Sequence, residues 1–358
     1  MSEIVPETMR AVVYRGVNDV RVETIAVPEI DESEVLVKIH TCGICGTDLK
    51  KIHTGSHDAP RVFGHEMAGT IVRIGTGVEG FAVGDRVMAY HHIPCGECYY
   101  CRKQTFAQCE VYKKVGCTAG FAPAGGGFAE YIRVMDWIVR RGLVKIPEGI
   151  PFEQAAFLEP VNTCYKAIQL LDLQADETVL VIGQGPIGIL LAALTRRTGA
   201  TVLTSDLYAE RHAVAAKFGL DRPIDARSDV VAATKAATEG RGADVALLAV
   251  GSDALIKVAM GAIRPGGRVM LFASTQHGEV PFDPAAVCMD EKTLMGSYSA
   301  SVAIQDDVTR MVFDGYRNGF DLTNLISHRF SLEDAVAAID LASHPQADSM
   351  KIVIQPES

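Results

Sequence analysis

A short apolar run that ends in closely spaced glycines constrains the fold of this chain more than any other feature. Residues 179–182 are all apolar and lead directly into Gly183-Gln184-Gly185-Pro186-Ile187-Gly188 and then a helical stretch. In such a turn the first glycine permits the tight bend, the second lets the backbone approach a pyrophosphate, and the third lets helix and strand pack closely. The junction predicts a doubly wound parallel sheet that binds a dinucleotide through Gly183, Gly185, Pro186, Ile187 and Gly188.

An acidic residue lies where such a fold binds the adenosine ribose. Asp206 ends the next apolar run, 23 residues after Gly183, close to the typical spacing of about 20. Because a carboxylate hydrogen-bonds the ribose 2′-hydroxyl and repels a 2′-phosphate, the sequence favours NAD over NADP. Arg211 is interpreted either as a solvated charge in the next helix or as a phosphate partner. The alternative to the whole site is a glycine turn beside a surface aspartate.

Two kinds of pattern divide the chain around this junction. Short β-rich runs separated by glycine turns predict an all-β or barrel-like domain at 9–14, 34–40, 68–74, 85–89 and 128–134. From residue 178, alternating strands and helices predict parallel βαβ units, with strands at 178–182, 201–205, 245–249 and 268–273 and helices at 187–197 and 210–218. The tail predicts helices at 304–318 and 332–342 and a strand at 351–355.

This order predicts a nucleotide-binding α/β domain, residues 161–298, inserted into a β-rich catalytic domain made of 1–160 and 299–358. The sequence alone does not prove that the tail returns to the first domain.

The charge balance excludes several partners. The chain has 34 Lys plus Arg and 44 Asp plus Glu, a formal net charge of −10, which argues against binding the nucleic-acid backbone. No stretch approaches the roughly 18 apolar residues of a membrane span, and Met1-Ser2-Glu3 lacks the features of a signal peptide. We therefore expect a cytoplasmic protein with neither nucleic-acid nor membrane partners.

Four of the nine cysteines follow the spacing C-x2-C-x2-C-x7-C, at Cys95, Cys98, Cys101 and Cys109. Four thiolates this close can surround one Zn²⁺ tetrahedrally and leave no position for water, which is typical of a structural site. The same ligands also suit an iron–sulfur cluster. His91 and His92 precede the loop and are expected to be loop residues in preference to ligands.

A second set of metal-binding residue types is dispersed along the chain, at Cys45, His65, Glu66 and Glu159. Thiolate, imidazole and carboxylate are the ligands of a catalytic zinc that keeps one position open. Taken singly, each has another interpretation: a small buried thiol, a core histidine or an acid at a helix end.

Together these features resemble the zinc-dependent medium-chain alcohol dehydrogenases, most closely the polyol branch of sorbitol- and L-iditol-like dehydrogenases. The resemblance spans essentially the whole chain. Besides the glycine turn and the four-cysteine loop, it is carried by residues 43–48, 64–66, 127–131, 158–160 and 205–207.

The resemblance implies a GroES-like catalytic zinc domain with an inserted Rossmann domain. It implies that Cys45 and His65 bind a catalytic zinc with Glu66 or Glu159, so that each chain holds two zinc ions and NAD. Lys351 falls where the family often has a basic residue that reaches the cofactor pyrophosphate; the alternative is a surface lysine. A homodimer or homotetramer is also implied.

The implied reaction is reversible oxidation of a secondary alcohol, on a small polyol or sugar-like molecule, to a ketone by hydride transfer. Thr47 stands where the family uses a hydroxyl to accept the substrate proton. Many members continue this relay through a His five residues after the ligand Cys, but here Lys50 has that place. His53 or Lys50 is the predicted substitute.

Two alternatives remain open. One is oxidation of an amino alcohol, as in L-threonine 3-dehydrogenases; the other is a non-catalytic NAD-binding protein on the same scaffold. The remaining cysteines are interpreted as packing residues: Cys42, Cys117, Cys164 and Cys288.

Overall fold

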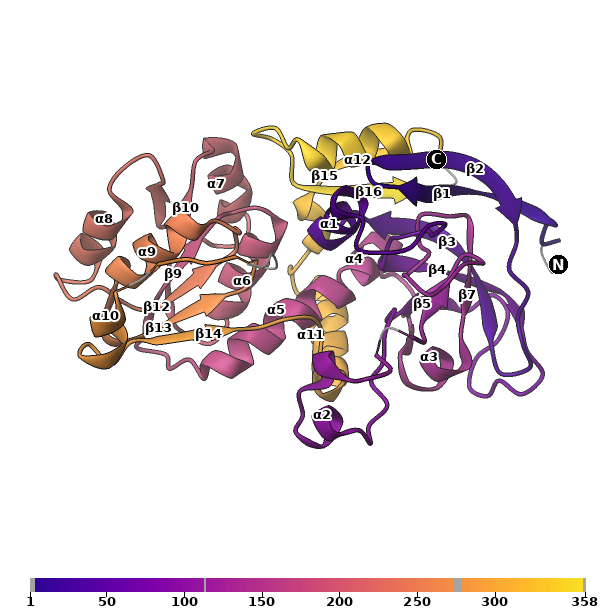
Figure 1. Ribbon diagram of the computed structural model, residues 1–358, viewed down its shortest axis with the longest axis horizontal. Helices are drawn as coiled ribbons and strands as arrows, with labels where there is room; N and C mark the ends of the chain where they lie inside the picture. The colour runs from indigo at the N-terminus through magenta and orange to yellow at the C-terminus, as the bar shows by residue number, and fades with distance from the viewer. Residues whose placement is uncertain (1–3, 113, 274–277, 282, 357–358) are drawn as a thin grey trace. The chain divides into compact units, whose positions relative to one another are not determined.

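The computed structural model describes residues 4–112, 114–273, 278–281 and 283–356. Met1–Glu3, on which the expectation about a signal peptide rests, lie outside the described residues. The chain forms two compact units (Figure 1): residues 1–159 with 301–358, and residues 160–300. Both ends of the chain therefore belong to one unit, which we call the β-rich unit, and the middle forms the α/β unit.

The α/β unit contains one six-stranded parallel sheet in the order β11-β10-β9-β12-β13-β14. Its strands are β9 Thr178–Ile182, β10 Thr201–Asp206, β11 Pro223–Asp225, β12 Ala243–Leu248, β13 Ile263–Leu271 and β14 Thr293–Gly296. Its helices are α6 Pro186–Arg196, α7 Ala209–Ala216, α8 Val230–Ala237, α9 Asp253–Ala262 and α10 Pro284–Cys288. This order is that of a doubly wound sheet: β9 comes first in the sequence but lies inside the sheet, with later strands on both sides of it.

Apart from Thr178 and Asp244, strands β9 and β12 consist of apolar residues. Residues 179–182 and all of β12 are buried, which is typical of parallel strands between helix layers. Helices α6 and α9 pack on these strands. The predicted α/β fold is confirmed.

The β-rich unit is built around an eight-stranded sheet with the order β15-β16-β3-β4-β5-β8, to which β7 and β6 are added beside β3. Its strands are β3 Val35–Gly43, β4 Glu66–Ile74, β5 Arg86–Ala89, β6 Cys117–Thr118, β7 Tyr131–Val134, β8 Leu143–Lys145, β15 Ile326–Ser331 and β16 Lys351–Gln355. A separate antiparallel pair is formed by β1 Thr8–Gly16 and β2 Asp19–Ala26. The C-terminal strand β16 pairs with β3, so the tail does return to this unit (Figure 1).

The predicted strand at 128–134 is shorter in the structure. Its first residues are bonded one by one to other segments: the Phe128 N–H donates to Phe63 and the Glu130 N–H donates to Arg10. Only Tyr131–Val134 joins the sheet as β7.

The helices of this unit are α1 Gly46–Thr54, α2 Tyr99–Arg102, α3 Asp136–Arg141, α4 Phe152–Ala156, α11 Gln305–Arg317 and α12 Ala335–Ser343, while α5 Leu158–Leu171 leads into the α/β unit. The buried Gln154 side chain joins α4 to the tail, because it donates to the Val312 carbonyl and accepts from the Leu322 N–H. Among the described residues, no helix is both long and apolar enough to cross a membrane.

Candidate metal and nucleotide sites

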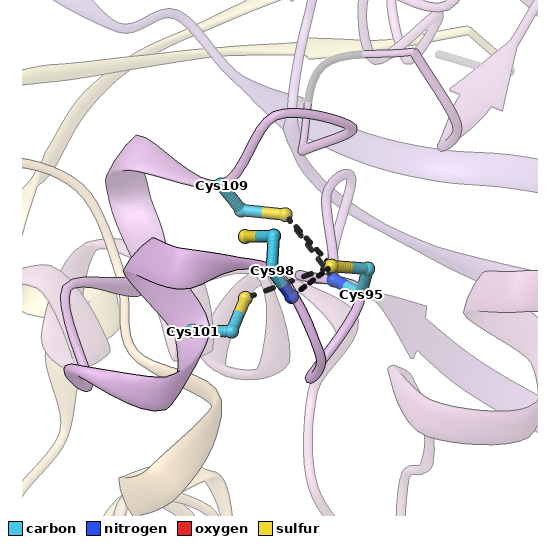
Figure 2. A group of neighbouring side chains, drawn as sticks. All are labelled: Cys95, Cys98, Cys101 and Cys109. Atoms are coloured by element: carbon cyan, nitrogen blue, oxygen red, sulfur yellow. Dashed lines mark hydrogen bonds between the residues drawn. The ribbon is translucent and has the colours of Figure 1, made fainter.

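The four-cysteine loop gathers its sulfur atoms at one point (Figure 2). The ligand atoms of Cys95, Cys98, Cys101 and Cys109 all lie within 4.8 Å of one another. The Cys95 Sγ is 3.8 Å from the Cys101 Sγ and 3.5 Å from the Cys109 Sγ. Four sulfurs at about 2.3 Å from a tetrahedral zinc are about 3.8 Å apart, whereas a disulfide needs about 2.0 Å. The donor set therefore fits one zinc ion with no open position.

Backbone donors prepare this loop for negative charge. The N–H groups of Glu110 and Cys101 bond to the Cys98 thiol and lower its pKa to about 6. The Cys95 N–H points at the Cys109 Sγ, at 3.3 Å. Such donors stabilise a thiolate, which is the form that binds a metal. Tyr112 packs on Cys101 and Cys109 and closes the cluster on one side.

The two histidines before this loop are not part of the cluster. The His91 ring packs on the His65 ring at 4.7 Å, and the His92 ring lies between the rings of His91 and Tyr112. Both histidines lie in a loop, as expected, although the His91 ring contacts His65 of the second site.

Three of the dispersed residues come together as the second group. The ligand atoms of Cys45, His65 and Glu66 lie within 4.8 Å of one another. Cys45 precedes α1, whereas His65 and Glu66 stand where β4 begins. Cys45 is far from His65 and Glu66 in the sequence but close to them in space, because β3 and β4 are antiparallel neighbours and Gly43 pairs with Glu66.

Asp48 is the residue that holds this group in place, and the sequence analysis gave it no role. Cys45 is the N-cap of α1, and its backbone N–H donates to the Asp48 carboxylate in a capping box. The same carboxylate, fully buried, lies 3.0 Å from the His65 Nδ1. One carboxylate thus begins the helix and orients the imidazole, an arrangement typical of metal-binding histidines. An acid three residues after a predicted N-cap is the signal that reveals it.

The second imidazole nitrogen of His65 faces the group. Its Nε2 lies 3.3 Å from the Thr47 hydroxyl, which also donates to the Cys45 Sγ at 3.2 Å. Burial lowers the pKa of His65, but the charges of Asp48 and Cys45 outweigh it and raise that pKa well above the usual value. The Thr47 hydroxyl therefore lies beside two of the candidate ligands, and its role as a proton acceptor stays a prediction.

Glu66 is buried and only half paired among the described residues. Its Oε2 accepts from the Lys351 Nζ at 2.5 Å, whereas its Oε1 has no hydrogen-bond partner. A side chain on Gly43 would place its Cβ 2.2 Å from that Oε2, so only glycine leaves room for the carboxylate. A buried carboxylate oxygen without a partner is costly, and beside a thiolate and an imidazole it fits a divalent zinc ion.

Lys351 is buried beside Glu66. Its side chain is 5% exposed, and its Nζ donates to Glu66 and to the Ile44 carbonyl at 3.2 Å. Burial lowers the pKa of Lys351, but the charges of Glu66 and Cys45 reverse this and raise it. The interpretation of Lys351 as a surface lysine is therefore wrong, because the residue forms a buried ion pair. Its contact with a cofactor pyrophosphate stays a prediction.

Glu159 lies near the group without joining it. It is 6% exposed, and burial together with the charge of Glu66 raises its pKa to about 7, against the opposing effect of His65 and Lys351.

The predicted relay residues behave differently from one another. His53 lies in α1, as the three-residue spacing from Lys50 required, but its ring nitrogens contact Asn18 at 2.6 Å and Ser343 at 2.9 Å. The His53 side chain is exposed. The continuation of the relay beyond Thr47, through His53 or Lys50, stays a prediction.

The glycine turn of the α/β unit has the predicted geometry. Gly183 has a φ of +94°, and a Cβ on Gly188 would lie 1.8 Å from the Gly183 carbonyl. By contrast, a Cβ on Gly185 would meet nothing within 4 Å. Gly185 is the N-cap of α6 and Pro186 its first residue, with Ile187 next. The turn lies at the carboxyl end of β9, between β10 and β12, which is where doubly wound sheets bind ligands.

Asp206 ends β10 beside this turn and is buried. Its carboxylate accepts from the Gln184 N–H at 2.6 Å and from the Tyr208 N–H at 3.0 Å. Arg211 Nη1 lies 3.5 Å from the carboxylate, and its guanidinium lies 4.8 Å from the Tyr208 ring. The interpretation of Arg211 as a solvated charge is wrong, because it is ion-paired and mostly buried.

The other cysteines are packing residues with one exception. Cys42, Cys117 and Cys164 are buried, and burial raises the pKa of the Cys117 thiol above its usual value. Cys288 is exposed, because the short helix α10 that carries it buries none of its residues.

Comparison with known proteins identifies the class and then the family. The profile of the alcohol dehydrogenase GroES-like domain matches residues 31–148, and that of the zinc-binding dehydrogenases matches residues 186–313. These matches confirm the predicted class, a GroES-like domain with an inserted Rossmann domain.

Full-length relatives agree with this class. The sorbitol dehydrogenase of Bombyx mori is 30% identical over 97% of this chain and 99% of its own. The L-threonine 3-dehydrogenase of Photorhabdus laumondii is 31% identical over 89% of this chain and 92% of its own. A zinc-binding dehydrogenase of Sinorhizobium meliloti 1021, solved with NADP, superposes with a TM-score of 0.86 at 29% identity, covering 98% of this chain and 100% of that one.

The chain belongs to the zinc-dependent medium-chain alcohol dehydrogenase family, in its polyol branch. It is accordingly an oxidoreductase of the kind that uses zinc and a nicotinamide cofactor.

Proposed function

We propose that this chain catalyses the reversible, NAD-dependent oxidation of a secondary alcohol of a polyol or sugar-like compound to a ketone. The observation that carries the proposal is the convergence of Cys45, His65 and Glu66 around a buried carboxylate oxygen that has no partner in the described part of the chain. The polyol class is supported by sorbitol dehydrogenase relatives that cover nearly the whole chain.

In this proposal Cys45, His65 and Glu66 hold the catalytic zinc, and Glu159 is the carboxyl that exchanges with Glu66. Bound there, zinc is a Lewis acid that lowers the pKa of a substrate hydroxyl. Asp48 keeps the His65 Nε2 directed at the group by bonding to Nδ1. Thr47 accepts the proton of the substrate hydroxyl at its Oγ1 and passes its own hydroxyl proton on toward solvent through His53 or Lys50, because a hydroxyl can accept one hydrogen bond while it donates another.

The α/β unit holds the dinucleotide. The open space at Gly185 lets a pyrophosphate approach the N-terminus of α6, and NAD supplies the hydride acceptor. Asp206 accepts from the adenosine ribose hydroxyl. Since Arg211 lies beside that carboxylate, replacing Asp206 with Ala is expected to move the ratio of kcat/KM for NAD over NADP toward NADP.

The four-cysteine loop holds a second zinc ion with a structural role, for which the sulfur distances and the lowered pKa of Cys98 speak. All nine cysteines are free in the structure, as is typical of a reducing compartment, so we propose the cytoplasm. We also propose a homodimer or homotetramer, to be measured by sedimentation.

Oxidation of L-threonine is the second candidate, because a relative of that name is 31% identical to this chain. An assay panel of sorbitol, other polyols and L-threonine, followed by NADH absorbance, separates the two. The expected result is turnover of a polyol at a kcat/KM at least about tenfold above that for L-threonine. Turnover of no alcohol by a protein with two bound zinc ions would instead favour the non-catalytic alternative.

A further inference from the structure

A lysine on α1 lies mostly buried beside the Cys45 group. Lys51 follows Asp48 by three residues in the helix, its side chain is 18% exposed, and its Nζ lies 3.7 Å from the Asp48 Oδ1. Lysines usually extend their ammonium group into water, and a charge taken out of water needs a compensating partner. The Asp48 carboxylate is such a partner, so the positive charge of Lys51 lies against a group that also contacts His65.

The same ammonium lies over an aromatic ring. The Lys51 Nζ is 5.3 Å from the centre of the Phe63 ring, within the range of about 6 Å for a cation–π contact. Phe63 is 2% exposed, and the rings of Tyr14 and His57 contact it with centres 5.3 and 5.7 Å away. Since Phe63 precedes His65 by two residues, Lys51 joins its own helix to the segment that carries a candidate zinc ligand.

Lys51 and His65 share one oxygen of the Asp48 carboxylate. The Asp48 Oδ1 lies 3.0 Å from the His65 Nδ1 and 3.7 Å from the Lys51 Nζ. The N–H groups of Gly64 and Cys45 also donate to this carboxylate, each at 3.4 Å. A histidine that binds a metal is neutral. Lys51 therefore supplies Asp48 with a full positive charge that remains when zinc is bound.

Asp48 and Lys51 have opposite effects on the imidazole. A carboxylate bonded to Nδ1 makes the histidine a stronger ligand. A positive charge on the same oxygen offsets part of that negative charge, because opposite charges at this distance interact strongly in a buried site. The imidazole then neutralises less of the charge of the bound ion, and it is this charge that polarises a substrate hydroxyl.

We propose that Lys51 is a positioning residue that acts through Asp48: it limits the negative charge that Asp48 presents to His65, and so limits how tightly the Cys45 group binds zinc. The inference rests on the zinc ligands of the proposed function. It predicts the direction of an effect, because loss of the Lys51 charge should tighten zinc binding, whereas loss of a purely structural contact would loosen it.

Competition with a chromogenic chelator, on the full-length protein, tests this direction. In Lys51→Met we expect the Cys45 group to bind zinc about three- to tenfold more tightly. Lys51→Arg keeps the positive charge and should bind zinc as the unsubstituted protein does. Comparison with Cys45→Ala shows which of the two zinc ions is being measured.

Lys145→Met is the matched control. The Lys145 Nζ lies 2.7 Å from an oxygen of Asp85 and 5.4 Å from the centre of the Phe81 ring, so it makes the same two kinds of contact as Lys51. None of these three residues belongs to either metal group. The affinity for zinc should therefore be unchanged in this variant.

A double-mutant cycle tests the route through Asp48. In Asp48→Asn the charge that Lys51 offsets is absent, so adding Lys51→Met should change the affinity by less than about twofold. Equal tightening with and without the Asp48 charge would show that Lys51 acts directly on the bound ion and would overturn the proposal. Weaker or unchanged binding in Lys51→Met would also overturn it and leave Lys51 a structural contact. Lys51→Gln, which is neutral as well, replaces Lys51→Met should that variant not fold.

Polyol turnover by the same preparations separates this inference from the proposed function. Turnover by a protein whose zinc affinity Lys51→Met leaves unchanged overturns the inference alone. Tighter zinc binding in Lys51→Met, in a protein that oxidises no alcohol, supports the inference and counts against the proposed function. A Cys45 group that binds no zinc overturns both.

Discussion

The two metal sites of the β-rich unit are built in different ways from similar ligands. The four-cysteine loop takes all its ligands from residues 95–109, and its outer contacts are backbone N–H groups and the Tyr112 ring. The Cys45 site takes its ligands from segments that β3 and β4 bring together, and its outer contacts are the buried charges of Asp48 and Lys351.

We expect the two sites to differ in what they contribute: the four-cysteine loop to stability and the Cys45 site to catalysis. Backbone donors and thiolates make a closed site whose removal affects folding. Buried charges around a mixed ligand set tune a metal that must also accept a substrate, and such contacts govern affinity and activity. A substitution in the Cys45 site should therefore lower activity more than stability. A matched substitution in the four-cysteine loop should lower stability more than activity.

The largest effect is expected for Cys45→Ala. Loss of the thiolate removes the catalytic zinc, and with it several kcal/mol of Lewis-acid stabilisation, so kcat/KM should fall by about 10³-fold or more. Metal analysis should give one zinc per chain in place of two. Cys42→Ala is the control, since Cys42 is a buried thiol only three residues away; it should keep both ions. Two zinc ions in Cys45→Ala would contradict the ligand assignment.

Cys101→Ser should show the reverse pattern. If zinc acts as a cross-link that closes the 15 residues from Cys95 to Cys109, its loss costs about 3 kcal/mol. For a unit of this size the melting temperature should fall by about 6 to 12 °C, as measured by calorimetry. At 25 °C the kcat/KM of the remaining folded enzyme should change less than tenfold. A fall as large as that of Cys45→Ala would show that the two sites are not independent.

Asp48→Asn tests the contact that orients His65. The amide keeps the shape and can still accept from the imidazole, but it removes the negative charge, so zinc should bind about 10- to 100-fold more weakly at this site. Competition with a chromogenic chelator measures this affinity. The zinc of the four-cysteine loop is the internal control, because its release should be unchanged. Unaltered affinity at both sites would reduce Asp48 to a helix cap.

The same difference explains what could be predicted from the sequence. The four-cysteine loop is local, so its spacing alone gave the ligand set, and the glycine turn is local for the same reason. The Cys45 group needed the pairing of Gly43 with Glu66, which no spacing rule supplies, and it was recognised through a family resemblance. Asp48 was not predicted because its carboxylate bonds to two separate segments, the Cys45 N–H at the start of α1 and the His65 ring before β4. The burial of Lys351 was not predicted, because a lysine on a terminal strand gives no local sign that it is buried.

The smallest effect, and the one that separates the predicted role of Lys351 from the observed one, is expected for Lys351→Met. Loss of the bond to Glu66 loosens one carboxylate ligand, but β4 still fixes its backbone and Glu159 lies near. Zinc affinity should therefore fall by up to about tenfold, with the KM for NAD changed less than twofold, and Lys351→Arg should restore most of the affinity. A lysine bound to the cofactor pyrophosphate would instead affect the binding of NAD. A raised KM for NAD with unchanged zinc affinity would therefore favour the predicted cofactor contact over a role of the ion pair in zinc binding.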